Sequence, residues 1–138
     1  MTPQPPSPGP DPQSALVARW LASEEAPQRA GLPRLDAAGT LALAWALKTA
    51  CHQVWNSSPG QAVQAARWLA LLADSAAAGP EVQALAQWTA GLAALVGGDM
   101  VQALQALEAA SAGFDANAQP LFAAQAGVPQ LIALSMLG

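Results

Sequence analysis

Apolar residues recur along this chain at the three- and four-residue spacing of an α-helix. Between these stretches stand Ser-Pro, Gly-Pro and Gly-Gly pairs, which end one helix and begin the next. The pattern predicts six helices: about 14–25, about 36–55, from Pro59 to before Gly79, from Pro80 to before Gly97, from Asp99 to before Asn117, and roughly 118–137. The chain has 35 alanines, no Tyr and two Phe, and this composition favours an all-α fold.

The helix starts carry local signals. Ser58 is expected to cap the third helix, with Pro59 at its first position and Gln61 reaching back to the cap. Asp99 with Gln102 gives a similar start for the fifth helix, and Asn117 is a candidate cap for the sixth. Proline lacks an N–H, so Pro129 is expected to kink or split the sixth helix.

Small residues mark the places where helices meet closely. Gly91, Gly98, Ala103 and Ala110 follow one another at intervals of 7, 5 and 7. Two helices press together only where facing positions are small, so this spacing around Gly98-Asp99 predicts an αα-hairpin. Turn glycines recur at Gly60, Gly98 and Gly138, about 40 residues apart, which is typical of stacked hairpins.

The second predicted helix has two apolar stripes, which indicates neighbours on both sides. Trp45, Lys48, His52 and Trp55 lie along one of them. In one interpretation they line a concave face and contact a protein or peptide partner. In the other, the tryptophans pack between layers and Lys48 extends past them. Trp20, Trp68 and Trp88 are predicted to lie in the core.

Charge and composition exclude several classes of function. The net charge is −4 with five scattered cations, which argues against a nucleic-acid surface. The apolar run from Ala90 to Val96 is far shorter than the ~20 residues of a membrane span. No secretory signal is recognisable, so we expect a cytoplasmic protein.

Residues 1–13 hold six of the twelve prolines and predict a disordered, extended tail. The helical domain is expected over 14–138. The chain stops where another turn between helices would begin, which leaves Leu131, Leu134 and Leu137 poorly covered. We therefore expect either a fragment cut before its last hairpin is complete or a chain that completes itself by association.

Catalytic chemistry has little support in the sequence. Cys51 and His52 are adjacent, and adjacent helical residues diverge by about 100° and do not face each other. One His, one Cys and no spaced carboxylate pair argue against a metal site. Gly97-Gly98-Asp99 lacks the rest of a phosphate-binding motif. We expect no enzyme activity, no metal and no cofactor.

With Gly98-Asp99 at a hairpin turn, Gly91, Ala103 and Ala110 fall on the small positions of the tetratricopeptide pattern and Leu107 on its large apolar position. Asp115 stands where that pattern has a helix-stopping proline. The segments LAWALKTACHQVW, EVQALAQWTAGLAALVGGDMVQALQALEAASAGF and AAQAGVPQLIALSMLG resemble the N-terminal helical region of bacterial CHAT-domain proteins, over roughly residues 40–138. In that family, tetratricopeptide-like repeats precede a caspase-like protease domain.

The resemblance implies an α-solenoid of five to six helices that serves as a docking or sensing module beside a peptidase. The family's catalytic residues belong to the domain that follows and have no counterpart here. We expect a protein–protein interaction scaffold that binds a partner or regulates an attached caspase-like domain. The alternative is a structural domain that forms homo-oligomers through its uncovered last helix.

Overall fold

The computed structural model describes residues 12–138 and is helical throughout, with no strand in that range. The elements are six α-helices and one short 3-10 helix: α1 (Pro12–Ala22), η1 (Arg29–Gly31), α2 (Ala37–Val54), α3 (Pro59–Ala73), α4 (Pro80–Val96), α5 (Met100–Ala116) and α6 (Pro120–Leu137). The prediction of an all-α chain with six helices is confirmed. The predicted tail lies outside the described residues, except that Pro12 and Gln13 belong to α1.

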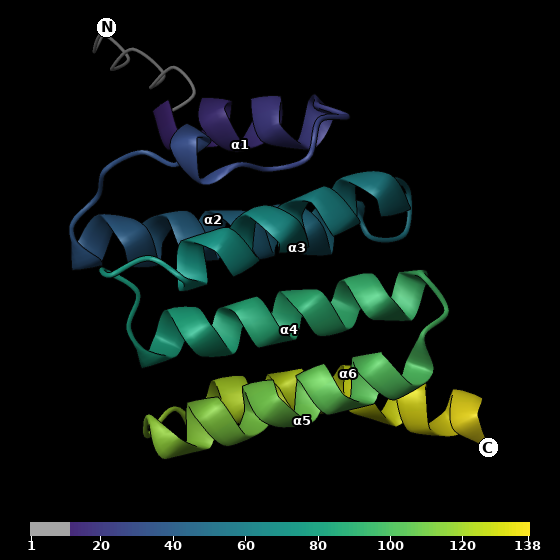
Figure 1. The fold of residues 1–138 in the computed structure, drawn as a ribbon. Coiled ribbons are helices and arrows are strands. Elements are labelled where there is room, and N and C mark those ends of the chain that lie inside the picture. The colour runs from purple at the N-terminus through teal and green to yellow at the C-terminus, as the bar shows by residue number, and fades with distance from the viewer. Residues whose placement is uncertain (1–11) are drawn as a thin grey trace, which may run out of the picture.

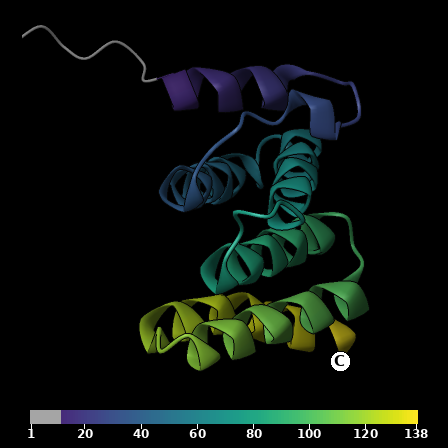
Figure 2. The ribbon, with the colours of Figure 1, turned by 60° about the vertical axis from the view of Figure 1, so that its left-hand side comes forward.

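The helices follow one another in layers, with α1 at one end and α5 and α6 at the other (Figures 1 and 2). Each helix from α2 onward packs on its neighbour in the sequence, and α2 also contacts α4 directly. In Figure 1, α4 lies between the α2–α3 pair and the α5–α6 pair. This central position explains why Val82, Leu85, Trp88 and Leu92 of α4 are all buried.

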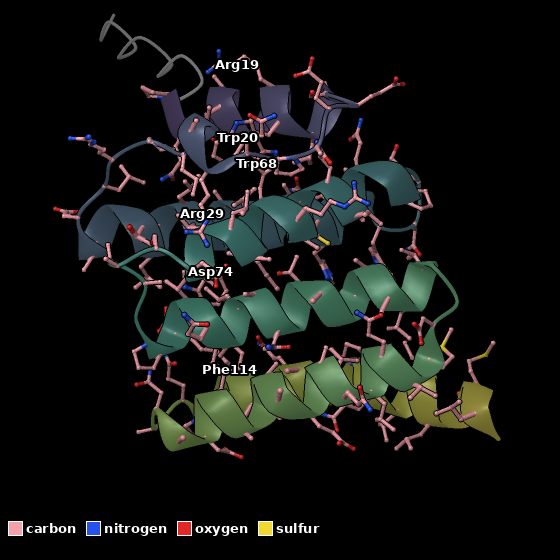
Figure 3. All side chains as sticks on the ribbon, in the orientation of Figure 1. Arg19, Trp20, Arg29, Trp68, Asp74 and Phe114 are labelled. Carbon is pink, nitrogen blue, oxygen red and sulfur yellow. The ribbon has the colours of Figure 1, made fainter. Side chains whose placement is uncertain are left out.

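Two stacked tryptophans connect α1 to α3. Trp20 of α1 and Trp68 of α3 lie parallel, with ring centroids 3.9 Å apart and planes 7° from each other (Figure 3). Both rings are buried, as predicted, and so is Trp88. Gly31 lies against the Trp68 ring, where a Cβ atom would come within 2.8 Å of it. The loop after α1 is thus packed closely onto α3.

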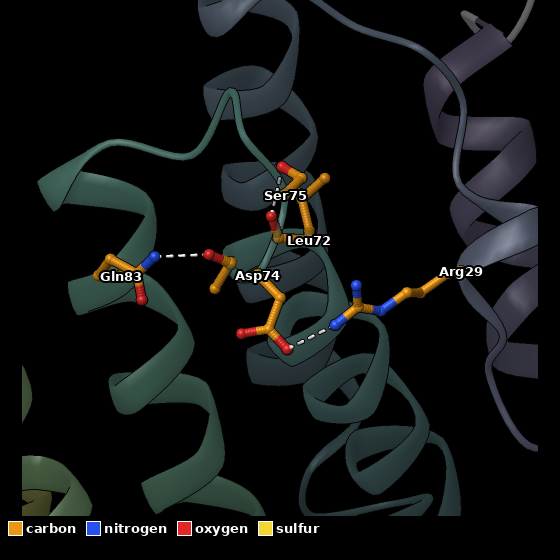
Figure 4. A network of polar contacts seen from close by, with 6 residues as sticks. Arg29, Leu72, Asp74, Ser75 and Gln83 are labelled. Carbon is orange, nitrogen blue, oxygen red and sulfur yellow. Dashed lines mark hydrogen bonds and ion pairs between the residues drawn. The ribbon is translucent and has the colours of Figure 1, made fainter.

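The turn between α3 and α4 is held by polar side chains (Figure 4). Ser75 Oγ donates to the Leu72 carbonyl, and Gln83 Nε2 donates from α4 to the Ala73 carbonyl. The bond from Gln83 satisfies a carbonyl at the end of α3, whereas the Leu72 carbonyl also accepts from the Ser75 N–H. Arg29 also reaches Asp74 at 3.5 Å, but both side chains are exposed and such a pair contributes little to stability.

The turn between α4 and α5 shows why Gly98 is needed. Its φ is +82°, a conformation that favours glycine. The Gly98 N–H donates to the Leu95 carbonyl and the Asp99 N–H to the Ala94 carbonyl, which closes the end of α4. Asp99 then accepts from the Gln102 N–H at 3.1 Å and caps α5, as predicted.

Several local predictions were wrong. The first helix ends at Ala22, not near residue 25, and Ser58 precedes α3 without making a side-chain cap. Asn117 caps no helix start: it follows α5 and donates to the side chain of Gln119, the residue before α6. Pro129 lies inside one continuous helix, so it does not split α6. The carbonyl that it leaves unbonded belongs to Gln125, which is exposed, so water can reach it.

Candidate interaction groove

The predicted contact residues lie on α2, on the side that faces α4 and α6. Lys48, His52 and Trp55 line a groove of about 390 Å³. Trp88 and Leu92 of α4 form its floor, and the other wall is α6, through Gln125, Val128, Pro129 and Ile132. We call this the α2–α6 groove. Its walls come from segments about 75 residues apart in the sequence.

Lys48 provides the charge in this groove. Its Nζ lies 3.8 Å from the centroid of the Trp88 ring and 6.0 Å from that of Trp45. An ammonium group over an indole face is attracted by the ring's negative surface. Burial lowers the pKa of Lys48, and a weaker interaction with Cys51 acts in the opposite direction. The side chain is half-buried and lines the groove.

His52 and Trp55 form the outer part of the same wall. Their rings are nearly parallel, 20° apart, with centroids separated by 6.5 Å. His52 is exposed and Trp55 is half-buried. The residues that line the groove include no Asp or Glu.

Trp45 has a different environment from the other three residues. Its Nε1–H donates to Glu81 Oε2 at 2.7 Å, and its ring contacts Phe122 with centroids 4.9 Å apart. Glu81 also accepts from Gln119 Nε2. These contacts tie α2 to the starts of α4 and α6, and they pack Trp45 between layers. Trp45 also lines a second groove, of about 560 Å³, between α1 and α2.

An aromatic chain supports the floor of the α2–α6 groove from behind. Phe114 of α5 is fully buried. Its ring lies nearly perpendicular to that of Trp88, with ring centroids 5.7 Å apart, and its centroid is 5.6 Å from that of Phe122. Phe122 in turn meets Trp45. Rings packed in this way leave little freedom to the side chains that they hold. The groove therefore has a rigid floor below Lys48.

Cys51 and His52 are not brought together. The Cys51 thiol is fully buried and donates to the Ala62 carbonyl at 3.7 Å, whereas His52 is exposed beside Trp55. Burial raises the pKa of Cys51 to about 11, which disfavours the thiolate that nucleophilic chemistry needs. Within residues 12–138, no three His, Cys, Asp or Glu side chains gather in a way that could hold a metal ion.

The sequence identified only one wall of the groove. Gln125, Val128 and Ile132 carried no signal as contact residues, and the nearest indication was the expectation that the last helix is poorly covered. In the described part of the chain, α6 is the one helix long and apolar enough to cross a membrane by length and composition. The prediction that no segment is long enough to span a membrane rested on the shorter run before Gly97.

Comparisons with known proteins leave this geometry without a relative. No family model matches the chain, and neither a curated protein nor a solved structure matches it. The assignment of a function therefore depends on the groove itself.

Proposed function

We propose that this chain is a protein–protein interaction module built from stacked αα-hairpins of the tetratricopeptide type. The pairing of α2 with α3 and of α4 with α5 supports this, as does the direct contact of α2 with α4 and of α4 with α6. In such a stack the first helices of successive hairpins line one concave face. The α2–α6 groove lies on those three helices.

The partner that fits this groove is an amphipathic segment with acidic side chains. The observation that carries the proposal is that Lys48 and His52 stand above an apolar floor and no carboxylate lines the groove. In a chain with net charge −4, this places positive charge where a partner segment would lie. Complementary charge favours encounter and register, and apolar burial supplies most of the affinity.

The proposal extends to the biological setting suggested by the CHAT-domain resemblance. There the module would act in the cytoplasm, without catalysis of its own, and would bind a partner for, or regulate, an adjoining caspase-like peptidase domain. A protein or peptide partner suits the groove better than nucleic acid, because the remaining cations, Arg19, Arg29, Arg34 and Arg67, lie outside it.

Binding of two model peptides tests the proposal. A labelled amphipathic helix of Leu and Glu is compared with one of Leu and Lys by fluorescence anisotropy. We expect saturable binding of the Leu/Glu peptide alone. Lys48→Met, which keeps most of the apolar stem, is expected to weaken that binding roughly tenfold. Trp55→Ala should weaken it by a similar factor.

Arg67→Met is the matched control, because Arg67 is an exposed cation of α3 outside the groove. It should leave the affinity for the Leu/Glu peptide unchanged. Equal binding of both peptides, or equal losses in Lys48→Met and Arg67→Met with the circular dichroism unchanged, would show that the groove does not select its partner by charge.

A further inference from the structure

The outer side of α6 exposes more large apolar side chains than the rest of the described structure. Seven of them on this helix are between 44% and 68% exposed: Leu121, Val128, Leu131, Ile132, Leu134, Met136 and Leu137. Three of these, at 131, 134 and 137, are positions that the sequence predicted to be poorly covered. Exposed apolar patches of a few hundred Å² mark interaction sites in soluble proteins.

The polar side chains of α6 do not oppose the burial of this face. Ser135 Oγ donates to the Ile132 carbonyl at 2.8 Å within the same helix. Gln130 Nε2 donates to the Leu107 carbonyl and to Ser111 Oγ, both of α5. No Asp, Glu, Lys or Arg occurs between Pro120 and Leu137. Covering the face would therefore strand neither a charge nor these hydrogen-bonding groups.

Spacing along the helix makes this face complementary to itself. Residues 121, 124, 128, 131 and 135 follow the alternating three- and four-residue steps of a helix–helix seam. If two copies of α6 run antiparallel about Val128, Leu121 lies opposite Ser135 of the other copy, and Leu131 lies opposite Gln125, next to Ala124. Leu121 then packs on a small side chain, and Val128 meets its own counterpart.

We infer that the outer face of α6 binds the α6 helix of a second copy of this chain, antiparallel and with the two-fold axis near Val128. Absence of charge on α6 favours this occupant, because two copies of net charge −4 then meet without like charges at the contact. A helix that lies on a membrane surface usually carries Lys or Arg on its polar side, and α6 has neither.

The exposed surface indicates a weak dimer. The three large side chains of the seam, Leu121, Val128 and Leu131, offer roughly 300 Å² of apolar surface per copy, less than half of the ~800 Å² per partner in a standard interface. We expect the dimer to appear as concentration rises. The dimer contact and the α2–α6 groove share Val128, but Leu121 and Leu131 do not line the groove, so changes at these two positions test the dimer separately.

Sedimentation velocity of the full chain over about a hundredfold range of concentration tests the dimer. The mass should rise from 14.0 kDa toward twice that value. Leu131→Glu places two carboxylates in the seam and should raise the dissociation constant roughly a hundredfold. Leu137→Glu is the control, since position 137 is nine residues from Val128, which is two and a half turns, and so lies on the opposite side of the helix. It should leave the dimer intact.

Cysteine cross-linking tests the orientation. Val128→Cys should form a disulfide between copies, because the axis brings its Cα atoms close together. Leu121→Cys should not, because its two copies lie about 21 Å apart in this register. The native Cys51 is fully buried and should stay unreactive in both variants.

Three outcomes would overturn the inference. They are a chain that stays monomeric throughout, a dimer broken by Leu137→Glu as easily as by Leu131→Glu, and cross-linking at 121 in place of 128. Flotation of a monomeric chain with phosphatidylcholine vesicles would assign the face to a lipid surface instead. The affinity of the Leu131→Glu variant for the Leu/Glu peptide is measured alongside. An unchanged affinity shows that loss of the dimer leaves peptide binding in the groove intact, so the two proposals can fail separately.

Discussion

Gly91 of α4 lies directly under Leu107 of α5. A Cβ atom at Gly91 would come 2.6 Å from Cγ and 2.7 Å from Cδ2 of Leu107. Leu107 is fully buried, so its side chain has no free space to move into. The close approach of α4 and α5 thus depends on the missing side chain at position 91.

We predict that Gly91→Ala destabilises the protein although alanine is the better helix former. Overpacking against Leu107 should cost about 1–3 kcal/mol, which outweighs a gain in helix propensity of at most about 1 kcal/mol. Urea denaturation followed by circular dichroism measures the free energy of unfolding. Gly127→Ala is the matched control, since nothing lies within 4 Å of a Cβ atom there, and it should stabilise α6 slightly.

At Ala118, replacing alanine by glycine should stabilise the protein. Its φ is +57°, and its N–H and that of Gln119 close the end of α5 on the carbonyls of Asp115 and Phe114. A left-handed alanine costs roughly 1 kcal/mol relative to glycine. We expect Ala118→Gly to raise the free energy of unfolding by up to that amount. Ala112→Gly, at an exposed position inside α5, should lower it by about 1 kcal/mol.

Glu81 is predicted to stabilise the junction of α2 with the starts of α4 and α6. It accepts from Trp45 Nε1 and from Gln119 Nε2, and all three residues are partly buried. Glu81→Ala leaves both donors without this partner and should cost about 1–3 kcal/mol in urea denaturation. Trp45→Phe combined with Glu81→Ala should cost less than the sum of the single changes. Glu108→Ala, at an exposed site on α5, should change the stability by less than about 0.5 kcal/mol.

We predict that the buried thiol of Cys51 makes the free energy of unfolding fall in alkaline solution. Burial raises its pKa from 9.0 to about 11 in the folded state. Below pH 9 the thiol is protonated in both states and its contribution is fully present. Between these values the unfolded chain loses the proton first, so the free energy of unfolding falls, in total by about 2–3 kcal/mol.

The measurement is a series of urea denaturations of the wild type and Cys51→Ala from pH 8 to about pH 11. The difference between them should shrink over this range by the amount given above. Because Lys48 has a lowered pKa, it acts in the opposite direction in alkaline solution, and the comparison removes its contribution apart from the weaker interaction between Lys48 and Cys51. Parallel curves for the two proteins would contradict the prediction.

Local chemistry explains why most of the fold was predictable. Six helices were recognisable because Pro, Gly and Asp signals act within a few residues, as the Asp99 cap and the Gly98 turn show. The same reasoning wrongly predicted helix caps at Ser58 and Asn117. Each is a suitable cap by type, yet neither makes that bond, because neighbouring turns set the local backbone.

Local residue patterns were enough to predict the helical class, the hairpin turn at Gly98 and the burial of three tryptophans. The packed fold was needed to show that Lys48, His52 and Trp55 face α6 while Trp45 turns to Glu81 and Phe122. Helical spacing places these four residues on one stripe, but it does not say which neighbour covers which part. That depends on the packing of helices distant in the sequence.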